Sequence, residues 1–213
     1  MGRIHVDLFA TMDGVAQAPG GPEEDLEGGF RFGGWQAPLL DEVGGGWVDA
    51  NLAGTDALLL GRRTYDIFAA YWPHQSGGPE DSIAGLFNRI PKYVASRNRA
   101  LPLPWQHATR VGDDLAAQVR ALRDRHAHVH VIGSVTLFQS LLAERLFDEL
   151  TLWVHPVVLG QGKRVFDPGT AARLRLLEPA ATSPAGVVQL RYALIEGEPE
   201  TGDMTLAPDA DAP

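Results

Sequence analysis

The chain has 213 residues, a formal charge of −9 and no cysteine, with 45% hydrophobic and 21% charged residues. This composition fits one globular domain with an ordinary core and excludes wholesale disorder. The lack of cysteine excludes disulfides, thiolate metal sites and a cysteine nucleophile. The apolar runs are too short to cross a bilayer, and the N-terminus lacks the apolar region of a signal peptide. We therefore expect a cytoplasmic protein without a membrane partner.

The negative charge is concentrated at the C-terminal end. Residues 196–213 contain six acids and no base, and without those acids the formal charge falls from −9 to −3. We expect a domain over residues 1–195 and an acidic, disordered tail over 196–213. Nucleic-acid binding depends on basic contacts to phosphate, so a chain with a pI of about 5.2 predicts no nucleic-acid partner.

Strand and helix patterns alternate along the chain, which predicts a single α/β domain with helices flanking a central sheet. The predicted strands are Ile4–Ala10, Ala57–Leu60, Lys92–Ala95, Val129–Ile132, Leu150–Val158 and Val187–Ile195. Asp113 and Asp114 are expected to cap a helix that runs to Arg125. A second helix opens at Ser134, and a third begins after Gly61.

Residues 13–47 differ from the rest because they hold ten of the 24 glycines. A loop of this length is usually functional or disordered. Phe30, Phe32 and Trp35 lie within it, so we predict a mobile flap over a substrate pocket. The alternative is a loop without a role.

Three strand-to-helix junctions combine small residues or hydroxyls with the start of a helix, at Gly61, Ser96 and Gly133. Ligands of open α/β sheets bind outside the carboxyl ends of the strands, where helix N–H groups favour anions. Three arginines, Arg62, Arg63 and Arg97, add positive charge there. Guanidinium groups match phosphate oxygens, so the pattern predicts a phosphorylated cofactor.

Other motifs are absent or ambiguous. Neither a Gly-x-Gly-x-x-Gly after the first strand nor a P-loop is present, and Gly160–Lys163 is interpreted as a turn. His126, His128 and His130 could bind zinc from one side of an extended segment, but surface histidines are the favoured interpretation. We therefore expect no metal site. His155 is interpreted as a strand residue, and no hydrolase motif occurs.

The combined pattern to about residue 195 resembles the dihydrofolate-reductase-like family, in the branch shared with the C-terminal reductase domain of riboflavin-biosynthesis enzymes. The segments that carry the resemblance are Thr11–Gly14, Leu60–Tyr65, Ala95–Arg97, Val131–Ser134, Phe147–Leu150, Pro156–Phe166 and Gly186–Leu190. The resemblance implies a mixed, mostly parallel sheet, NADPH as the cofactor, and a homodimer to which the strand with Trp153 could contribute.

The same resemblance implies roles for individual residues. Gly61 to Thr64 would approach the cofactor's phosphates, and Arg62 with Ser96 and Arg97 would surround the 2′-phosphate. The start of a helix would lie under the pyrophosphate, and the first strand with the turn after it would line the nicotinamide. The complete cofactor set is Ala10, Val15, Ala16, Gly61, Arg62, Arg63, Thr64, Ser96, Arg97, Gly133, Ser134, Val135, Thr136, Leu137 and Phe138.

The substrate side is less defined. Asp13 is the catalytic candidate, for orienting a substrate or delivering a proton, and a plain Asp-Gly turn is equally compatible. Trp35 belongs to the flap, while Tyr71 and Trp72 could form an aromatic wall or pack in the core. Dihydrofolate reductases hold the pterin with an acid on the helix before the Gly61 strand. No acid falls at that spacing here, so folate is not the expected substrate.

The sequence thus predicts an NADPH-dependent oxidoreductase that transfers a hydride to a small heterocyclic or carbonyl substrate. One alternative is the riboflavin-pathway ribosylaminopyrimidine reductase itself, although the fused zinc deaminase motif is missing. A non-catalytic nucleotide-binding protein is the other.

Overall fold

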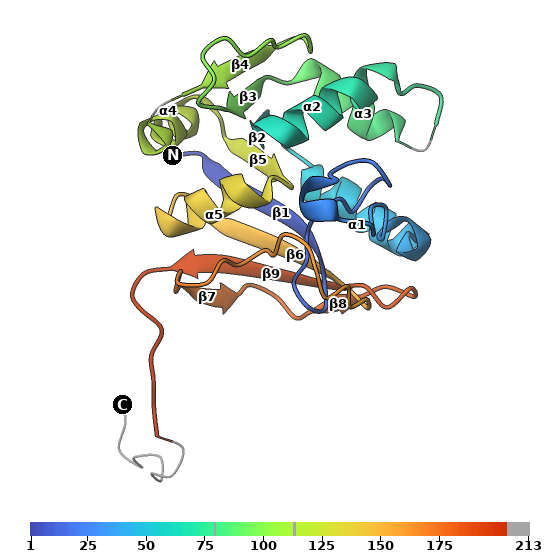
Figure 1. The fold of residues 1–213 in the computed structure, drawn as a ribbon. Coiled ribbons are helices and arrows are strands. Elements are labelled where there is room, and N and C mark those ends of the chain that lie inside the picture. The colour runs from blue at the N-terminus through green and yellow to red at the C-terminus, as the bar shows by residue number, and fades with distance from the viewer. Residues whose placement is uncertain (79, 113, 204–213) are drawn as a thin grey trace.

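The strands form one mixed sheet in the order β4-β3-β2-β5-β1-β6-β9-β7, with β8 beside β9 (Figure 1). The computed structural model describes residues 1–78, 80–112 and 114–203. The strands are β1 (Arg3–Thr11), β2 (Ala57–Gly61), β3 (Lys92–Ala95), β4 (Ala108–Val111), β5 (His128–Ile132), β6 (Glu149–His155), β7 (Arg173–Leu176), β8 (Ala181–Thr182) and β9 (Val188–Ile195). The helices are α1 (Glu42–Leu52), α2 (Arg62–Tyr71), α3 (Asp81–Arg89), α4 (Leu115–Arg125) and α5 (Val135–Ala143).

Strands β1 to β6 pair in parallel, whereas β9 pairs antiparallel with β6, β7 and β8. Strand β2 lies inside the parallel part of the sheet and is buried on both faces, which explains why Ala57 to Leu60 are all apolar and all buried. The expected fold class, an α/β domain with a mixed, mostly parallel sheet between helices, is confirmed.

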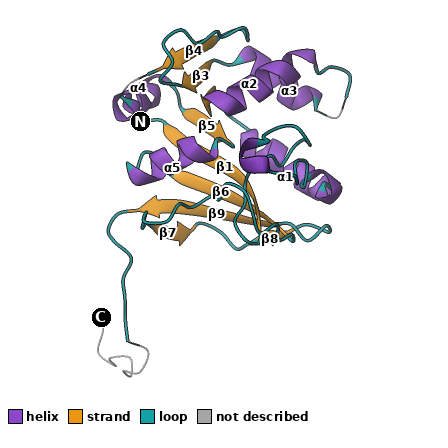
Figure 2. Ribbon diagram, in the orientation of Figure 1, coloured by secondary structure: helices purple, strands orange, loops and turns teal. Residues whose placement is uncertain are grey.

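Helices cover both faces of the sheet (Figure 2). On one face, α4 and α5 pack through residues such as Val119 and Leu141 on the even-numbered residues of β1. On the other face, α2 and α3 pack on Leu58 and Leu60, and Leu52 at the end of α1 joins the same cluster. Because side chains alternate along a strand, the odd-numbered residues of β1 face the α1 side.

The predicted strands are confirmed, with one shorter than expected. The strand that we predicted to reach Val158 ends at His155. Pro156 follows, and it cannot continue the hydrogen-bond ladder of the sheet because its nitrogen carries no hydrogen. The sequence analysis missed β4, β7 and β8, which are short or carry charged residues.

The expectation of an open glycine-rich loop over residues 13–47 is wrong in two respects. Helix α1 already begins at Glu42 and includes the three consecutive glycines, with Asp41 as its N-cap accepting from Gly44 N–H at 2.7 Å. Phe30 and Trp35 are buried in a cluster with Val15 and Ala18 rather than displayed on a flap.

The predicted helices are confirmed as α2, α4 and α5, with α3 and α1 missed. Asp114 caps α4, whereas Asp113 lies outside the described residues. Sheet residues end at Ile195, at the predicted domain boundary. Beyond it, Glu198 and Glu200 pair with arginines of the domain, and the rest of the predicted tail, residues 204–213, lies outside the described residues.

Trp153 is buried under α1, so its side chain is not open to a partner, and the contribution of its strand to a homodimer stays a prediction. Among the residues that the structure describes, no helix combines the length and apolarity needed to cross a membrane.

The packing of α5 on the sheet gives a stability prediction. Leu141 has no exposed surface, so Leu141→Ala should lower the free energy of unfolding by about 2–5 kcal/mol in urea denaturation. Leu40, which is 67% exposed, supplies the control, and Leu40→Ala should change stability by less than about 0.5 kcal/mol. Equal losses in the two variants would contradict the observed packing.

Candidate functional site

The carboxyl ends of β2, β3 and β5 meet at one edge of the sheet, where α2 and α5 begin. The Ser134 hydroxyl accepts from the Gly61 N–H at 2.8 Å and donates to the Thr64 hydroxyl at 2.7 Å. Gly61 is in register with Ala95, so Ser96 follows directly beside it. The structure therefore brings Gly61, Ser96 and Gly133 together as predicted. We call the group Gly61, Thr64, Ser96, Gly133 and Ser134 the cradle.

Local backbone geometry produces the cradle. Gly133 and Ser134 both have a φ of +61°, so β5 turns sharply into α5, with Ser134 as a non-glycine residue in the left-handed region. A Cβ at residue 61 would lie 2.9 Å from Ser134 Oγ, so only glycine fits between β2 and this turn. The cradle thus combines two helix N-termini with close backbone approach, which suits an anionic ligand.

The predicted arginines are adjacent to cradle residues in the chain, and two of them are paired with carboxylates. Arg62 Nε donates to Asp66 at 2.6 Å, while Arg63 Nη1 reaches carboxylates of residues 25 and 27. Arg97 is exposed. The sequence analysis missed Arg110, which donates to the Ser96 carbonyl at 2.6 Å. Its strand, β4, gave no clear pattern.

An ion-pair network ties the segment after β1 to the cradle. Lys163 Nζ lies 2.6 Å from both Asp25 and Glu27, the two carboxylates that also bind Arg63. Burial opposes ionisation of Asp25, but hydrogen bonds from Lys163 and Arg63 lower its pKa overall. Gly160–Lys163 is a bent segment after the end of β6, with Gly160 and Gly162 at positive φ.

Next to this network lies a hollow of about 270 Å³. It is lined by Gln17, Glu27, Gly28, Phe30, Gln161, Gly162 and Lys163. Its lining offers one cation, two amides, one carboxylate and one aromatic ring, and the carboxylate of Glu27 links it to Arg63 in the first turn of α2.

Several predicted cofactor residues lie at this edge but are buried. Ala10, Ala16 and Leu137 belong to the main core, Phe138 has no exposed surface, and Val15 packs with Phe30 and Trp35. Their side chains build the floor of the site rather than its surface. Val135 and Thr136 form the first turn of α5.

Asp13 has a structural role in this structure. Its carboxylate accepts from the Thr11 hydroxyl at 2.6 Å and from the backbone N–H groups of Leu159 and Gly160. The hydrogen bond from Thr11 is the main cause that lowers the pKa of Asp13 to about 2. A carboxyl with this pKa carries no proton at neutral pH, which argues against the predicted proton delivery. Instead, Asp13 holds the turn after β6 against the end of β1.

The predicted substrate aromatics do not form one wall. Trp35 is buried, donates to the Gln17 carbonyl at 2.8 Å and stacks edge-on against His155. Trp72 packs between Phe68 and Phe87 in the core under α2 and α3, so the alternative of core packing is the correct one for it. Tyr71 is exposed and donates to Glu80.

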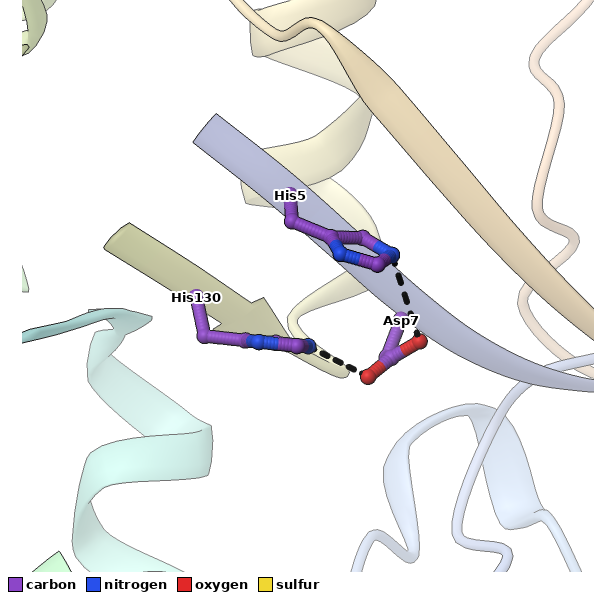
Figure 3. A group of neighbouring side chains, drawn as sticks. All are labelled: His5, Asp7 and His130. Atoms are coloured by element: carbon purple, nitrogen blue, oxygen red, sulfur yellow. Dashed lines mark hydrogen bonds and ion pairs between the residues drawn. The ribbon is translucent and has the colours of Figure 1, made fainter. Parts of the chain in front are cut away.

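A second polar group lies under α1, on β1 and β5. His5, Asp7 and His130 point toward one another (Figure 3), and the His130 ring donates from Nε2 to Asp7. The interpretation of His130 as a surface histidine is wrong, because only 2% of the residue is exposed. His155 is a strand residue, as predicted.

The polar group is enclosed by hydrogen bonds. Asn51 Nδ2 and Trp153 Nε1 donate to Asp7 Oδ1 at 2.5 and 3.4 Å. His5 Nε2 lies 2.7 Å from the Thr151 hydroxyl. Burial alone would raise the pKa of Asp7, but the charge and hydrogen bond of His130 lower it. Burial lowers the pKa of His5 to about 4. Asp7 is therefore ionised and His5 neutral at pH 7.

A cavity of about 360 Å³ opens beside this group, between the second half of α1 and the first residues of the strands. It is lined by Arg3, His5, Trp47, Ala50, Asn51, Ala53, Thr55, His128, Val129, His130, Glu149, Glu178, Gln189 and Arg191. The sequence offered one signal for it: polar residues at alternate positions of a strand otherwise made of core residues.

The sheet order and the helices on both faces define an α/β protein of the dihydrofolate reductase fold. Residues 3–188 match the RibD C-terminal domain, so the chain belongs to the RibD C-terminal domain family and is related to the reductase of riboflavin biosynthesis. The uncharacterized protein YyaP of Bacillus subtilis (strain 168) is 27% identical over 197 residues, which cover 89% of this chain and 94% of that protein.

Two solved structures show the same fold. A putative riboflavin biosynthesis protein from Shewanella sp. PV-4 superimposes with a TM-score of 0.68 at 20% identity, covering 91% of this chain and 99% of that one. A dihydrofolate reductase from Enterococcus faecalis, complexed with NADP(H), gives a TM-score of 0.55 at 14% identity, with 92% and 98% covered.

The neutral, buried state of His5 predicts a pH dependence of stability. As the pH falls from 6.5 to 4, His5 takes up a proton in the unfolded chain but not in the folded one, so the folded state loses stability. His5→Gln should reduce this loss by about 1–3 kcal/mol in urea denaturation between those pH values. His128→Gln, on the same sheet but exposed, is the control. Parallel pH profiles for wild type and His5→Gln would rule out the buried neutral state.

Proposed function

We propose that this protein is an NADPH-dependent reductase that transfers a hydride to a small heterocyclic or carbonyl substrate. The observation that carries the proposal is the Ser134 hydroxyl, which joins the starts of α2 and α5 at one sheet edge. Two helix N-termini that are joined through one side chain provide neighbouring backbone N–H donors for two linked phosphates. Membership of the RibD C-terminal domain family supports the same function.

The cradle and its arginines would hold the dinucleotide. Gly61, Thr64 and the first turn of α5 would contact the pyrophosphate, and Arg62 with Arg97 would bind the 2′-phosphate that distinguishes NADPH from NADH. The bound cofactor would supply the hydride. The buried floor of Ala10, Ala16 and Leu137 would exclude water from the reacting end.

The hollow beside the cradle is our candidate substrate site. Lys163 would bind a polar substrate, and Phe30 would supply an apolar surface. Because Asp13 is ionised, the proton that completes the reduction would come from water or from another polar group beside the substrate.

A more specific candidate is the reduction of a ribosylaminopyrimidine in riboflavin biosynthesis. The match to the RibD C-terminal domain favours it. Activity confined to this substrate, among a panel of carbonyl and heterocyclic compounds, would establish the specific function. NADPH binding without turnover of any compound would favour a non-catalytic protein. We also propose a homodimer, to be tested by light scattering.

The cofactor preference can be tested with the two arginines that flank the cradle. Arg62→Ala combined with Arg97→Ala should lower the preference for NADPH over NADH about 10–100-fold in fluorescence titration, because each lost charge-assisted hydrogen bond contributes to 2′-phosphate binding. Arg120→Ala, on the exposed face of α4, should leave the preference unchanged. Equal affinity of the wild type for the two nucleotides would count against NADPH as the cofactor.

The cradle itself can be tested with one methyl group. Gly61→Ala would place a Cβ 2.9 Å from Ser134 Oγ and displace the serine. The Kd for NADPH should therefore rise at least tenfold, which corresponds to a loss of roughly 1.4 kcal/mol of binding free energy. In α3, a Cβ at Gly85 would meet nothing within 4 Å, so Gly85→Ala is a matched control without effect on binding. Unchanged affinity in Gly61→Ala, with the fold intact, would disprove the cofactor site.

A further inference from the structure

The polar group under α1 contains three side chains that are common metal ligands. Within the described residues, one ligand atom each from His5, Asp7 and His130 lies within 4.8 Å of the others. They come from the neighbouring strands β1 and β5, which fixes their backbone positions (Figure 3). We propose that these three residues bind a divalent transition-metal ion such as Zn²⁺, at a site separate from the cradle.

The ligand chemistry suits such an ion. Two imidazoles and one carboxylate prefer zinc and its first-row neighbours over calcium or magnesium, which prefer oxygen ligands. Metal binding requires a neutral imidazole and an ionised carboxylate. An ionised carboxylate in a buried setting is also an attractive position for a cation.

Hydrogen bonds from neighbouring residues orient two of the three ligands. Asn51 and Trp153 both bind Asp7 Oδ1, which leaves Oδ2 for the ion. Thr55 Oγ1 lies 3.2 Å from His130 Nδ1, which leaves Nε2 for the ion. Metal-binding histidines and carboxylates are commonly held in this way through their other polar atom.

The spacing is compatible with coordination after small movements. The ligand atoms of His5, Asp7 and His130 lie within 4.8 Å of one another, and two ligands of a tetrahedral zinc ion are separated by about 3.4 Å. The ion would replace the direct contact between His130 and Asp7 and the contact of His5 with Thr151. The freed Thr151 hydroxyl would then face the site as a hydrogen-bond partner.

The fourth coordination position would face the cavity of about 360 Å³, which both histidines line. Three protein ligands and one open position are typical of metal sites that bind water or a substrate oxygen, whereas structural zinc sites usually have four protein ligands. The cavity rim carries Arg3 and Arg191, each paired with Glu149. The site would therefore accept water or a small oxygen ligand.

The test is direct metal binding by the full-length protein after treatment with a chelator. We expect one Zn²⁺ per chain in calorimetry, with a Kd below about 10 μM. We also expect Co²⁺ to give visible absorption bands of a four-coordinate site. His5→Gln and His130→Gln should each raise the Kd at least about tenfold. Asn51→Ala, which removes a donor to Asp7 but no ligand, should raise the Kd less than either histidine variant does.

Matched controls separate this site from adventitious binding. His74→Gln and His107→Gln remove exposed histidines outside the group and its cavity and should leave the affinity and the cobalt spectrum unchanged. Circular dichroism shows whether each variant is folded, and the cobalt spectrum of the wild type tests the proposal without any variant. Absence of one-to-one binding by the folded wild type would overturn the proposal. Binding that survives in both His5→Gln and His130→Gln would overturn it as well. NADPH binding is measured in parallel, so the proposed function and the metal site fail or stand independently.

Discussion

The hydrogen bonds of one hydroxyl group fix the geometry of the edge that we assign to cofactor binding. Ser134 Oγ is bonded to the Gly61 N–H and the Thr64 hydroxyl, so the helices that follow β2 and β5 cannot move independently at their starts. Because β2 and β5 are neighbours in the sheet, the turn at Gly133 must pass over Gly61 at van der Waals distance. A side chain at residue 61 would push this turn away, so the glycine is a requirement of packing rather than of backbone conformation.

Local patterns in the sequence were sufficient to predict the strands and helices that build this edge. Strand β2 is an apolar run that ends at Gly61, and α4 and α5 are marked by capping residues before an apolar face. The cap of α4 and the apolar faces act over a few residues and do not depend on the rest of the fold, whereas the Ser134 side chain caps no helix and bonds to Gly61 and Thr64. The meeting of the three strand ends also follows from these local signals, because parallel strands joined by helices all end at the same edge of the sheet.

Elements that depend on distant contacts could not be predicted in the same way. Helix α1 contains three glycines, which disfavour helix formation by roughly 1 kcal/mol each relative to alanine. It forms because Asp41 caps it and Trp47 packs on Trp153, more than 100 residues away in the chain. In the same way, the partner of Asp7 is His130, which no local pattern can identify. Asp25 and Glu27 were unremarkable acids in the sequence, yet they neutralise the cations beside the cradle.

The two faces of β1 explain why a polar group can persist in the middle of this sheet. Its even-numbered residues, Ile4 to Ala10, form the apolar core with α4 and α5 and supply the stability of the domain. The opposite face therefore has room for His5 and Asp7, provided that each polar atom finds a partner. Apolar side chains at these positions would avoid the cost of burying a carboxylate, which a paired charge at best offsets. Stability alone therefore does not explain why this polar group is buried in the sheet, whereas binding of a ligand does. This reasoning favours a functional role for the face under α1, next to the cavity and distinct from the cradle.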